Sequence, residues 1–460
     1  MHFRELDSGQ VLISNLVNNY FLLESKNDLI SLVKGSVPKS LSKPLEQGLF
    51  ISSESDFESK VKLTASAFSK NLNRDLQGQR LIMIVPTLRC DHSCTYCQVS
   101  RANLNDKGFD LPLSLIPNLI EFILKVETPP YKIEFQGGEP LLALDFIKMF
   151  YEQFAEKVSE DNFSIVIATS LSLVDEEILD YVKEKNIGFS TSIDSGSYAH
   201  NKHRRLIKKN SFELMKRNTL LIKEKLGNDR LGTVTTVTNE GLNSFNELVD
   251  THIELGIQDL FVRPVSSFGF AAGRFSSAVS VDEFVDFLKN LILRLIKEFQ
   301  QGRVVIEHFF FIHYKRLINA AHGGYVDLMS PAGYAKQSLI IDYTGNIFGS
   351  DEARMIYRRH GGEELVLGTI ETRQLNLDTS FSSNLLSQSF NFDIPGCSDC
   401  VYQNACGSDP IYHIQEQGEP IGNKSKSAFC ELHKKVFDLV IKLRQDPSSE
   451  YVFQQWLAYE

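Results

Sequence analysis

The seven cysteines of this 460-residue chain fall into two groups that lie far apart in the sequence. The first group lies within residues 90–97 and the second within residues 397–430. The complete set is Cys90, Cys94, Cys97, Cys397, Cys400, Cys406 and Cys430. The N-terminus has neither the basic flank nor the apolar run of a secretory signal, so we expect a cytoplasmic protein with reduced thiols. Closely spaced thiols in a reducing compartment indicate metal ligation rather than disulfides.

The composition limits what else the chain can be. With 42% hydrophobic and 23% charged residues it is typical of globular proteins and unlike disordered, collagen-like or coiled-coil chains. Its apolar runs all fall short of the roughly 18 residues of a membrane helix. The formal charge of -10 argues against nucleic acid as the main ligand, although a local basic patch is present. The patch comprises Lys202, Arg204, Arg205, Lys208 and Lys209.

The first cysteine group has the spacing Cys-x3-Cys-x2-Cys. Structural zinc takes four ligands in a closed tetrahedron, whereas three thiolates on a short loop suit a four-iron cluster with one iron left open. An open iron is able to bind a substrate. A zinc loop completed by His92 is the alternative.

A second motif follows the next predicted strand. The apolar run at 81–85 precedes the cysteines, and the run at 131–135 leads into Gln136-Gly137-Gly138-Glu139-Pro140. Glycines allow the backbone to approach a ligand closely, and a carboxylate accepts hydrogen bonds from an ammonium group. By itself, such a turn also describes a plain connection between a strand and a helix.

Short apolar runs alternate with amphipathic stretches from residue 80 to about residue 264. The predicted strands are 81–85, 131–135, 163–168, 188–193, 233–237 and 259–263, and the predicted helices are 113–126, 141–158, 175–184, 211–226 and 244–255. Such β-α repeats predict a parallel sheet with right-handed crossovers, curved into most of a barrel. Chemistry gathers where the strands of such barrels end. The residues there are Cys90, Gln136, Thr169, Ser170, Asp194, Asn239 and Arg263.

Together, the cysteine motif, with an aromatic residue before its third cysteine, and the Gly-Gly-Glu-Pro turn resemble the radical S-adenosylmethionine (SAM) superfamily. In that family an open iron of a [4Fe-4S] cluster chelates SAM. The resemblance implies Cys90, Cys94 and Cys97 as cluster ligands. It also implies SAM contacts from Tyr96 near the adenine, Gly137, Gly138 and Glu139, and Thr169, at a strand end, is a further candidate cofactor contact.

The segment from Ser192 to Arg204 resembles the fourth-strand region of radical SAM peptide maturases, although Ser195-Gly196 replaces the usual Gly-Pro pair. The resemblance implies that Ser192 lies near the SAM ribose or carboxylate. Asp194 and Arg263, which both lie at strand ends, are candidate catalytic residues, and Arg263 could pair with a carboxylate of SAM or of the peptide. The alternatives are that Asp194 caps a helix, that Arg263 makes an ordinary ion pair, and that His200 and Arg204 brace a loop.

The second cysteine group, Cys397-x2-Cys400-x5-Cys406-x23-Cys430, is compatible with a zinc knuckle or an iron–sulfur cluster. It resembles the SPASM extension of radical SAM peptide maturases, which holds auxiliary [4Fe-4S] clusters. Pro410 and Ser350 stand where that family has two further cysteines, so the resemblance implies only the outer auxiliary cluster, bound by these four cysteines.

Residues 340–348 resemble the SPASM hairpin, which predicts a hairpin here, and two acidic residues, Asp351 and Glu352, follow it where an inner cluster would otherwise lie. Asp351 is therefore a candidate catalytic carboxylate, and surface charges at a turn are the alternative. Residues 1–75 have their own apolar pattern and predict a small α+β domain. Its strands would accept an extended leader peptide by edge addition, or the domain is a plain structural extension.

Over nearly its whole length the chain resembles the B-type radical SAM maturases of His-Xaa-Ser peptide systems (HxsB). The resemblance implies an α/β fold with three domains: a peptide-recognition-like domain (1–75), a partial (β/α)6 TIM-like radical SAM barrel (76–300) and a SPASM-like domain (301–460). It implies two [4Fe-4S] clusters, one of them SAM-binding and one auxiliary.

The function implied is modification of a ribosomally made precursor peptide by a 5′-deoxyadenosyl radical, with a cyclophane-type crosslink as the first expectation. Thioether formation and epimerisation stay open, as does a non-catalytic, zinc-bound peptide carrier. The expected partners are a precursor peptide with its leader, an electron donor such as flavodoxin or ferredoxin, and a paired maturase, without nucleic acid or membrane.

Overall fold

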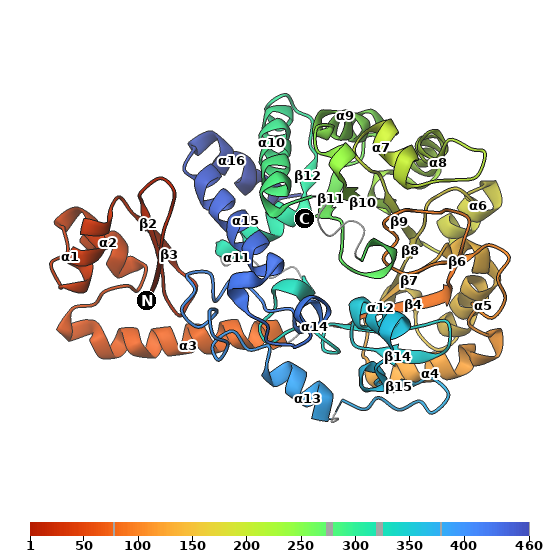
Figure 1. Cartoon of the computed structure of the whole chain (residues 1–460), viewed down its shortest axis with the longest axis horizontal. Helices are drawn as coiled ribbons and strands as arrows, with labels where there is room; N and C mark the ends of the chain where they lie inside the picture. The colour runs from red at the N-terminus through yellow and green to blue at the C-terminus, as the bar shows by residue number, and fades with distance from the viewer. Residues whose placement is uncertain (77–78, 273–278, 319–324, 378–379, 460) are drawn as a thin grey trace. The chain divides into compact units, whose positions relative to one another are not determined.

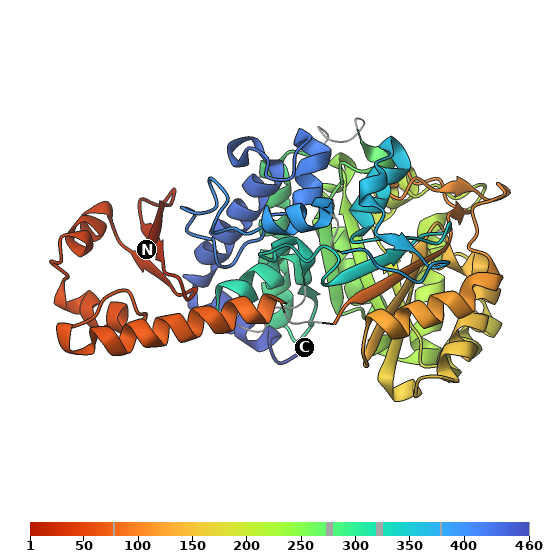
Figure 2. The same cartoon turned by 90° about the horizontal axis from the view of Figure 1, so that it is seen from below.

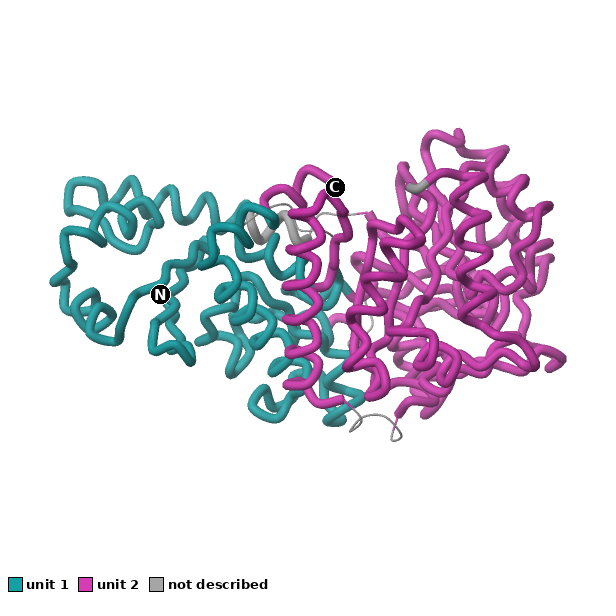
Figure 3. The backbone as a smooth tube through the Cα atoms, turned by 90° about the horizontal axis from the view of Figure 1, so that it is seen from above, with its two compact units in different colours: residues 1–78, 310–333, 384–453 teal, residues 79–309, 334–383, 454–460 magenta. Residues whose placement is uncertain are grey.

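The computed structural model describes residues 1–76, 79–272, 279–318, 325–377 and 380–459. The chain divides into two compact units, shown separately coloured in Figure 3. Unit 1 comprises residues 1–78, 310–333 and 384–453, and unit 2 comprises residues 79–309, 334–383 and 454–460. Within the described ranges, no helix combines the length and apolar character needed to span a bilayer.

Unit 2 is built on a ten-stranded sheet whose centre is six parallel strands in the order β11-β10-β9-β8-β7-β4. These strands are β4 (Leu81–Thr87), β7 (Tyr131–Gly137), β8 (Phe163–Ala168), β9 (Gly188–Ser192), β10 (Leu231–Val237) and β11 (Asp259–Pro264). Each lies within two residues of its predicted bounds. The predicted α/β fold with a central parallel sheet is confirmed.

The helices between these strands pack on the outer side of the sheet (Figures 1 and 2). They are α4 (Ile116–Val126), α5 (Leu144–Ala155), α6 (Glu176–Glu184), α8 (Ser211–Leu226) and α9 (Phe245–Leu255), followed by α10 (Val281–Gln300). Phe135 of β7 makes edge contacts with Phe146 and Phe150 of α5, so the apolar positions of the strand face this layer. The alternate positions of β7 therefore face the inside of the curved sheet.

One predicted loop is a helix. Residues 196–203 form α7 (Gly196–His203), where we expected a loop that His200 would brace. Its buried residues are Gly196, Ala199, His200 and His203, which are small or polar. Hydrophobic periodicity in the sequence does not reveal a helix whose buried face is polar, and for this reason the helix was predicted as a loop.

Strands on both sides extend the sheet. β12 (Ile306–Glu307) pairs in parallel with β11, and β13 (Ser338–Ile341) pairs in parallel with β4. β13 and β14 (Asn346–Phe348) form the predicted hairpin, and β15 (Gly368–Thr369) pairs with β14. The helix α12 (Asp351–His360) begins directly after the hairpin, with Ser350 as its N-cap.

Unit 1 begins with an antiparallel sheet of β1 (His2–Glu5), β2 (Val11–Ser14) and β3 (Tyr20–Leu23), followed by α1 (Lys26–Val33), α2 (Lys39–Gln47) and α3 (Phe57–Leu76). Its small core comprises Val11, Ile13, Leu23, Leu32 and Leu45. The later helices of this unit include α14 (Pro410–Gln417) and α15 (Ala428–Arg444). Three further α-helices lie in the described residues: α11 (His308–Leu317), α13 (Ser380–Ser387) and α16 (Pro447–Trp456).

Candidate functional site

The first cysteine group lies on a loop at the carboxyl end of β4. Two short parallel strands close this loop, β5 (Arg89–Cys90) and β6 (Ala102–Asn103). The amide of Cys97 donates to the carbonyl of Cys94 at 3.3 Å. In their thiolate forms Cys90 and Cys94 interact electrostatically, and so do Cys94 and Cys97. The structure therefore brings the three sulfurs close together. Burial raises the pKa of the Cys94 thiol to about 12.

Backbone donors surround the third cysteine. Burial raises the pKa of Cys97, and hydrogen bonds from the backbone N–H groups of Arg101, Val99 and Ser100 oppose this rise. Ser100 adopts the left-handed conformation, with φ of 54°, within this turn. Hydrogen bonds to sulfur stabilise a metal-bound thiolate and influence the potential of an iron–sulfur cluster. The loop therefore fits an anionic metal–thiolate centre.

The Gly-Gly-Glu-Pro turn packs directly on the chain that leads to Cys90. The amide of Gly138 donates to the carbonyl of Thr87 at 3.0 Å, and the amide of Glu139 donates to that of Arg89 at 2.8 Å. A Cβ atom on Gly138 would lie 2.1 Å from the carbonyl oxygen of Arg89. Only glycine fits at this position, because any side chain would push β7 away from the cysteine loop.

The carboxylate of Glu139 already has a full set of protein donors. The hydroxyl of Thr169 donates to Oε1 at 2.7 Å, and the amide of Leu141 donates to the same oxygen at 3.2 Å. Ser170 donates its amide and its hydroxyl to Oε2 at 2.9 Å and 2.7 Å. Four donors satisfy the lone pairs of both oxygens, so in this structure Glu139 and Thr169 join the ends of β7 and β8.

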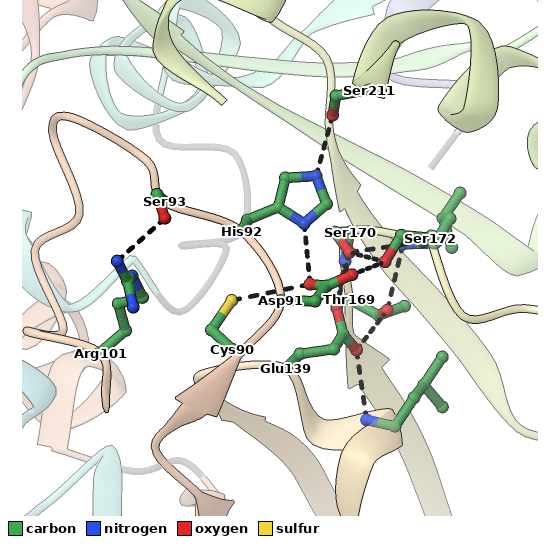
Figure 4. A network of polar contacts seen from close by, with 12 residues as sticks. Cys90, Asp91, His92, Ser93, Arg101, Glu139, Thr169, Ser170, Ser172 and Ser211 are labelled. Atoms are coloured by element: carbon green, nitrogen blue, oxygen red, sulfur yellow. Dashed lines mark hydrogen bonds and ion pairs between the residues drawn. The ribbon is translucent and has the colours of Figure 1, made fainter. Parts of the chain in front are cut away.

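A chain of polar contacts continues from Ser170 to the cysteine loop (Figure 4). Ser170 and Ser172 share a hydrogen bond of 2.9 Å, and Ser172 donates to Asp91. Asp91 pairs with Nδ1 of His92 at 2.8 Å, and Nε2 of His92 pairs with the hydroxyl of Ser211 at 2.9 Å. Both ring nitrogens of His92 are thus engaged, which argues against His92 as a zinc ligand.

Asp194 connects the loop to the end of β9. The hydroxyl of Tyr96 donates to Asp194 Oδ2, and Arg204 Nε lies 3.4 Å from the same oxygen. The other oxygen, Oδ1, accepts from the amide of Thr236 at 3.3 Å. The N-cap of α7 is Ser195, so the interpretation of Asp194 as a helix cap is wrong. The guanidinium of Arg204 lies 5.5 Å from the centre of the Tyr96 ring. Burial raises the pKa of Cys94, and the positive charge of Arg204 opposes this rise.

Polar side chains lie on the inner face of the curved sheet. In β9 the buried Phe189 and Thr191 alternate with the partly exposed Ser190 and Ser192. In β11 the buried Val262 precedes the partly exposed Arg263, which pairs in register with Thr236. Ser192 and Arg263 therefore share the inner face, at the end of the sheet where the cysteine loop lies.

Asp351 lies inside the unit and not at a surface turn. It is 9% exposed, in the first turn of α12, and its Oδ1 accepts from Arg354 Nε at 2.7 Å. Its negative charge acts on Glu134 of β7. Arg354 in turn interacts with the charge of Cys97. The segment after the hairpin thus meets both the inner face of the sheet and the cysteine loop.

Glu134 is a site residue that sequence reasoning missed. Burial raises its pKa to about 7, and the charge of Asp351 adds to the rise. Because the folded pKa lies above the unfolded one, the contribution of Glu134 to stability is fully present below about pH 4.5 and is lost as the pH rises through 7. Glu134→Gln should therefore stabilise the protein at about pH 8, by about 1–3 kcal/mol, and have little effect at about pH 5.

Thermal unfolding of Glu134→Gln and wild type across this pH range tests this expectation. The exposed Glu156→Gln is a matched control that should follow wild type at every pH. A Glu134→Gln variant that unfolds at the wild-type temperature at about pH 8 would show that the carboxylate is well solvated.

The four later cysteines gather in unit 1. Cys397, Cys400, Cys406 and Cys430 line one small cavity. Electrostatic interactions link Cys406 with each of the other three. Among the described residues, no group of three His, Cys, Asp or Glu side chains is arranged to hold a single metal ion.

A buried lysine lines the same cavity. Lys424 is 8% exposed, and its ammonium donates to Ser408 Oγ at 2.9 Å and to the carbonyl of Ile421 at 2.5 Å. A third contact of 3.2 Å joins it to Nε2 of His413, whose Nδ1 lies 2.6 Å from the carbonyl of Asp409. That carbonyl requires the proton on Nδ1, so Nε2 accepts from Lys424 and these three contacts are all to neutral groups.

Comparison with known proteins follows this geometry. Residues 84–252 match the model of the radical SAM superfamily. The uncharacterised protein MJ0907 of Methanocaldococcus jannaschii is 28% identical over 192 residues, which are 40% of this chain and 62% of that protein's length. A cysteine-type anaerobic sulfatase-maturating enzyme of Clostridium novyi is 23% identical over 76% of this chain and 91% of that enzyme.

Two solved structures share the fold. The enzyme anSMEcpe with bound AdoMet is 17% identical, with a TM-score of 0.66 over 82% of this chain and 99% of its own. Streptococcus suis SuiB bound to its precursor peptide SuiA is 13% identical, with a TM-score of 0.55 over 94% and 98%. The cysteine loop and the turn packed against it both lie within the matched residues, so residues 84–252 are similar to the radical SAM superfamily, and the chain shares the fold of these two solved structures.

Proposed function

We propose that this protein is a radical SAM maturase that modifies a ribosomally made precursor peptide, with a side-chain crosslink of the cyclophane type as the product. The observation that carries this proposal is the loop with Cys90, Cys94 and Cys97, held against the Gly-Gly-Glu-Pro turn at the carboxyl end of a parallel sheet. Three thiolates there would bind a [4Fe-4S] cluster with one open iron. When bound, the cluster and SAM supply the 5′-deoxyadenosyl radical that abstracts hydrogen from the peptide.

The surrounding residues would hold SAM and the peptide. Tyr96, fixed by Asp194, stands in the loop beside the sulfurs, and Ser192 and Arg263 face the inside of the sheet. Gly137 and Gly138 let the turn pack closely on the chain that leads to Cys90, and we assign both as SAM contacts. Asp351, whose Oδ1 accepts a hydrogen bond from Arg354, is our candidate for the group that removes a proton from the peptide.

A peptide substrate is supported by the fold comparisons. SuiB has been solved with its precursor peptide, and anSMEcpe with the Cp18Cys peptide. In this chain β1 and β3 are the edge strands of the N-terminal sheet, and either would accept a leader peptide as an added strand. We assign peptide recognition to residues 1–75, the radical chemistry to residues 76–300 and an auxiliary centre to residues 301–460. We further propose that the protein is a cytoplasmic enzyme of the His-Xaa-Ser type and that it acts with a second maturase.

The auxiliary centre is supported by Lys424. Burying an ammonium without a counter-charge costs several kcal/mol, and its three contacts are to neutral groups. The charge of Asp409 interacts with Lys424, and a four-thiolate centre in the same cavity is anionic and would supply further negative charge. We assign an outer [4Fe-4S] cluster to Cys397, Cys400, Cys406 and Cys430, where it would accept the electron released when the peptide radical closes a crosslink. Four protein ligands leave no open iron for the peptide itself.

Lys424→Met provides a direct test of this centre. Removing a positive charge should make the cluster harder to reduce, lowering its potential by about 50–100 mV. Potentiometric titration of the Cys90→Ala, Cys94→Ala, Cys97→Ala background, followed by electron paramagnetic resonance, isolates the outer cluster. The matched control is Lys426→Met, because Lys426 is an exposed lysine two positions along the same short helix. Equal potentials in the two variants would contradict the role of Lys424.

Mass spectrometry of a co-expressed precursor peptide tests the reaction. A crosslink removes two hydrogens, whereas epimerisation leaves the mass unchanged and takes up deuterium from solvent. A peptide that emerges unchanged, with SAM also uncleaved, would contradict the proposed function. Metal analysis after anaerobic purification separates the enzyme from a zinc-bound peptide carrier, because two four-iron clusters require about eight irons per chain.

A further inference from the structure

An exposed basic segment follows α7. Arg205, Lys208 and Lys209 are exposed, and with Asn201, Leu206 and Asn210 they line a hollow of about 480 Å³. Two apolar side chains accompany these charges: Ile207 is 75% exposed and Tyr198 of α7 is 68% exposed. We call residues 198 and 205–209 the basic patch.

The charge of this patch contrasts with the rest of the chain. The protein carries a formal charge of -10, whereas the patch contains three cations in five consecutive residues. The neighbouring Lys202 is neutralised by Glu240, at 2.5 Å. Glu213, in the first turn of α8, is an exposed acid beyond the patch. A local positive field on an acidic protein attracts acidic partners to this face.

The patch is joined to the loop of the first cysteine group by backbone contacts. The amide of Ser93 donates to the carbonyl of Arg205 at 2.8 Å, and the amide of Thr95 donates to that of His203 at 3.0 Å. His92 and Leu206 form an antiparallel bridge. Cys94 lies between the two donors in the sequence, so the segment that carries the patch runs beside this cysteine.

We propose that the basic patch is the docking site of an acidic one-electron carrier protein of the flavodoxin class. This inference rests on the proposed function, because it supplies the electron that SAM cleavage consumes. One electron leaves the reduced flavin and enters the cluster bound by Cys90, Cys94 and Cys97, with no proton or group transferred in that step.

The size and chemistry of the patch suit such an encounter. Complexes of electron-transfer proteins bury little surface and dissociate readily, and charges around a small apolar centre steer them together. Ile207 and Tyr198 are the exposed apolar side chains of the patch, and Arg205, Lys208 and Lys209 provide the charges. An acidic segment of the precursor peptide is the other occupant that this chemistry would accept, and the experiment separates the two.

The test uses the holoenzyme and the double variant Lys208→Glu, Lys209→Glu. The matched control is Lys132→Glu, Lys183→Glu: both are exposed lysines, and Lys132 pairs in register near the start of β4, at the opposite end of the sheet. Binding of flavodoxin is measured by calorimetry at several salt concentrations. Formation of 5′-deoxyadenosine, without peptide, is measured with reduced flavodoxin and separately with dithionite.

We expect the patch variant to bind flavodoxin at least tenfold more weakly at low salt. With reduced flavodoxin it should form 5′-deoxyadenosine at least tenfold more slowly, whereas with dithionite the rate should equal that of wild type. The difference should shrink as salt is raised, because screening weakens the attraction. Glu213→Gln, which removes an acid, should strengthen binding. The control variant should match wild type.

Equal flavodoxin binding and equal rates in the patch variant and wild type would overturn the docking site while leaving the proposed function intact. A patch variant that forms 5′-deoxyadenosine with reduced flavodoxin at the wild-type rate, but binds the precursor peptide more weakly, would also overturn the docking site. The acidic segment of the peptide would then be the occupant of the patch. Absence of 5′-deoxyadenosine with dithionite in the wild type would instead contradict the proposed function.

Discussion

Exchange of Cys90, Cys94 and Cys97 for alanine should abolish SAM cleavage and halve the iron content, from about eight to about four irons per chain. The three sulfurs lie on one closed loop and interact electrostatically, so they would act as one ligand set. Losing all three would leave no site for an open iron. Iron is measured by colorimetric assay, and 5′-deoxyadenosine by chromatography under dithionite.

The complementary variant, with alanine at the four later cysteines, is the control. These residues line a different cavity in unit 1, so this variant should lose the other half of the iron and still cleave SAM without peptide. It should not complete the peptide product. A triple variant that retains the full iron content, or that still forms 5′-deoxyadenosine, would contradict the assignment of the first cysteine group.

The substitution Gly138→Ala should have an effect nearly as large. Its Cβ would lie 2.1 Å from the carbonyl oxygen of Arg89 and 2.4 Å from that of Leu88, which are backbone atoms that cannot turn aside. Relief of such overpacking typically costs 1–3 kcal/mol and here requires β7 to move away from the chain that carries Cys90. We expect a loss of at least 100-fold in SAM cleavage, together with weaker SAM binding by calorimetry.

Gly232→Ala is a matched control. This glycine lies in β10 of the same sheet, and an added Cβ would meet no atom within 4 Å. It should retain SAM binding and cleavage close to those of wild type. If Gly138→Ala behaved like Gly232→Ala, the close packing of the turn on the cysteine loop would not be what positions the site.

The fold was predictable because its signals are local. Each central strand is a short apolar run and each central helix an amphipathic one, so residues 163–168 and 211–226 were placed exactly as β8 and α8 occur. The helix α7 was not predictable, because its buried side includes His200 and His203. Their burial is compensated by hydrogen bonds from elsewhere in the chain and not by an apolar period.

The candidate site was predictable only where residues adjacent in sequence share one role. The cysteines of the loop meet that condition, and so do the glycines of the turn. The contacts that organise the site join distant residues: Ser172 meets Asp91 across 81 positions, and Ser211 meets His92 across 119. Glu134 and Lys424 likewise gain their significance from burial beside other charges, which a single sequence does not display.

Glu139 illustrates how the structure changes an interpretation. The sequence motif makes it a contact of the SAM amino group, whereas its oxygens already accept four hydrogen bonds within the protein. The direct contact stays a prediction. The structure supports a role for Glu139 in joining β7 to β8, so that the turn and the cysteine loop keep a fixed relation.

The most direct test of the central claim is the incubation of anaerobically reconstituted protein with SAM and dithionite, followed by quantification of 5′-deoxyadenosine and methionine. The account predicts that wild-type protein releases both products in equal amounts. Protein with a full complement of about eight irons that releases neither would contradict the claim that this loop holds a SAM-cleaving cluster.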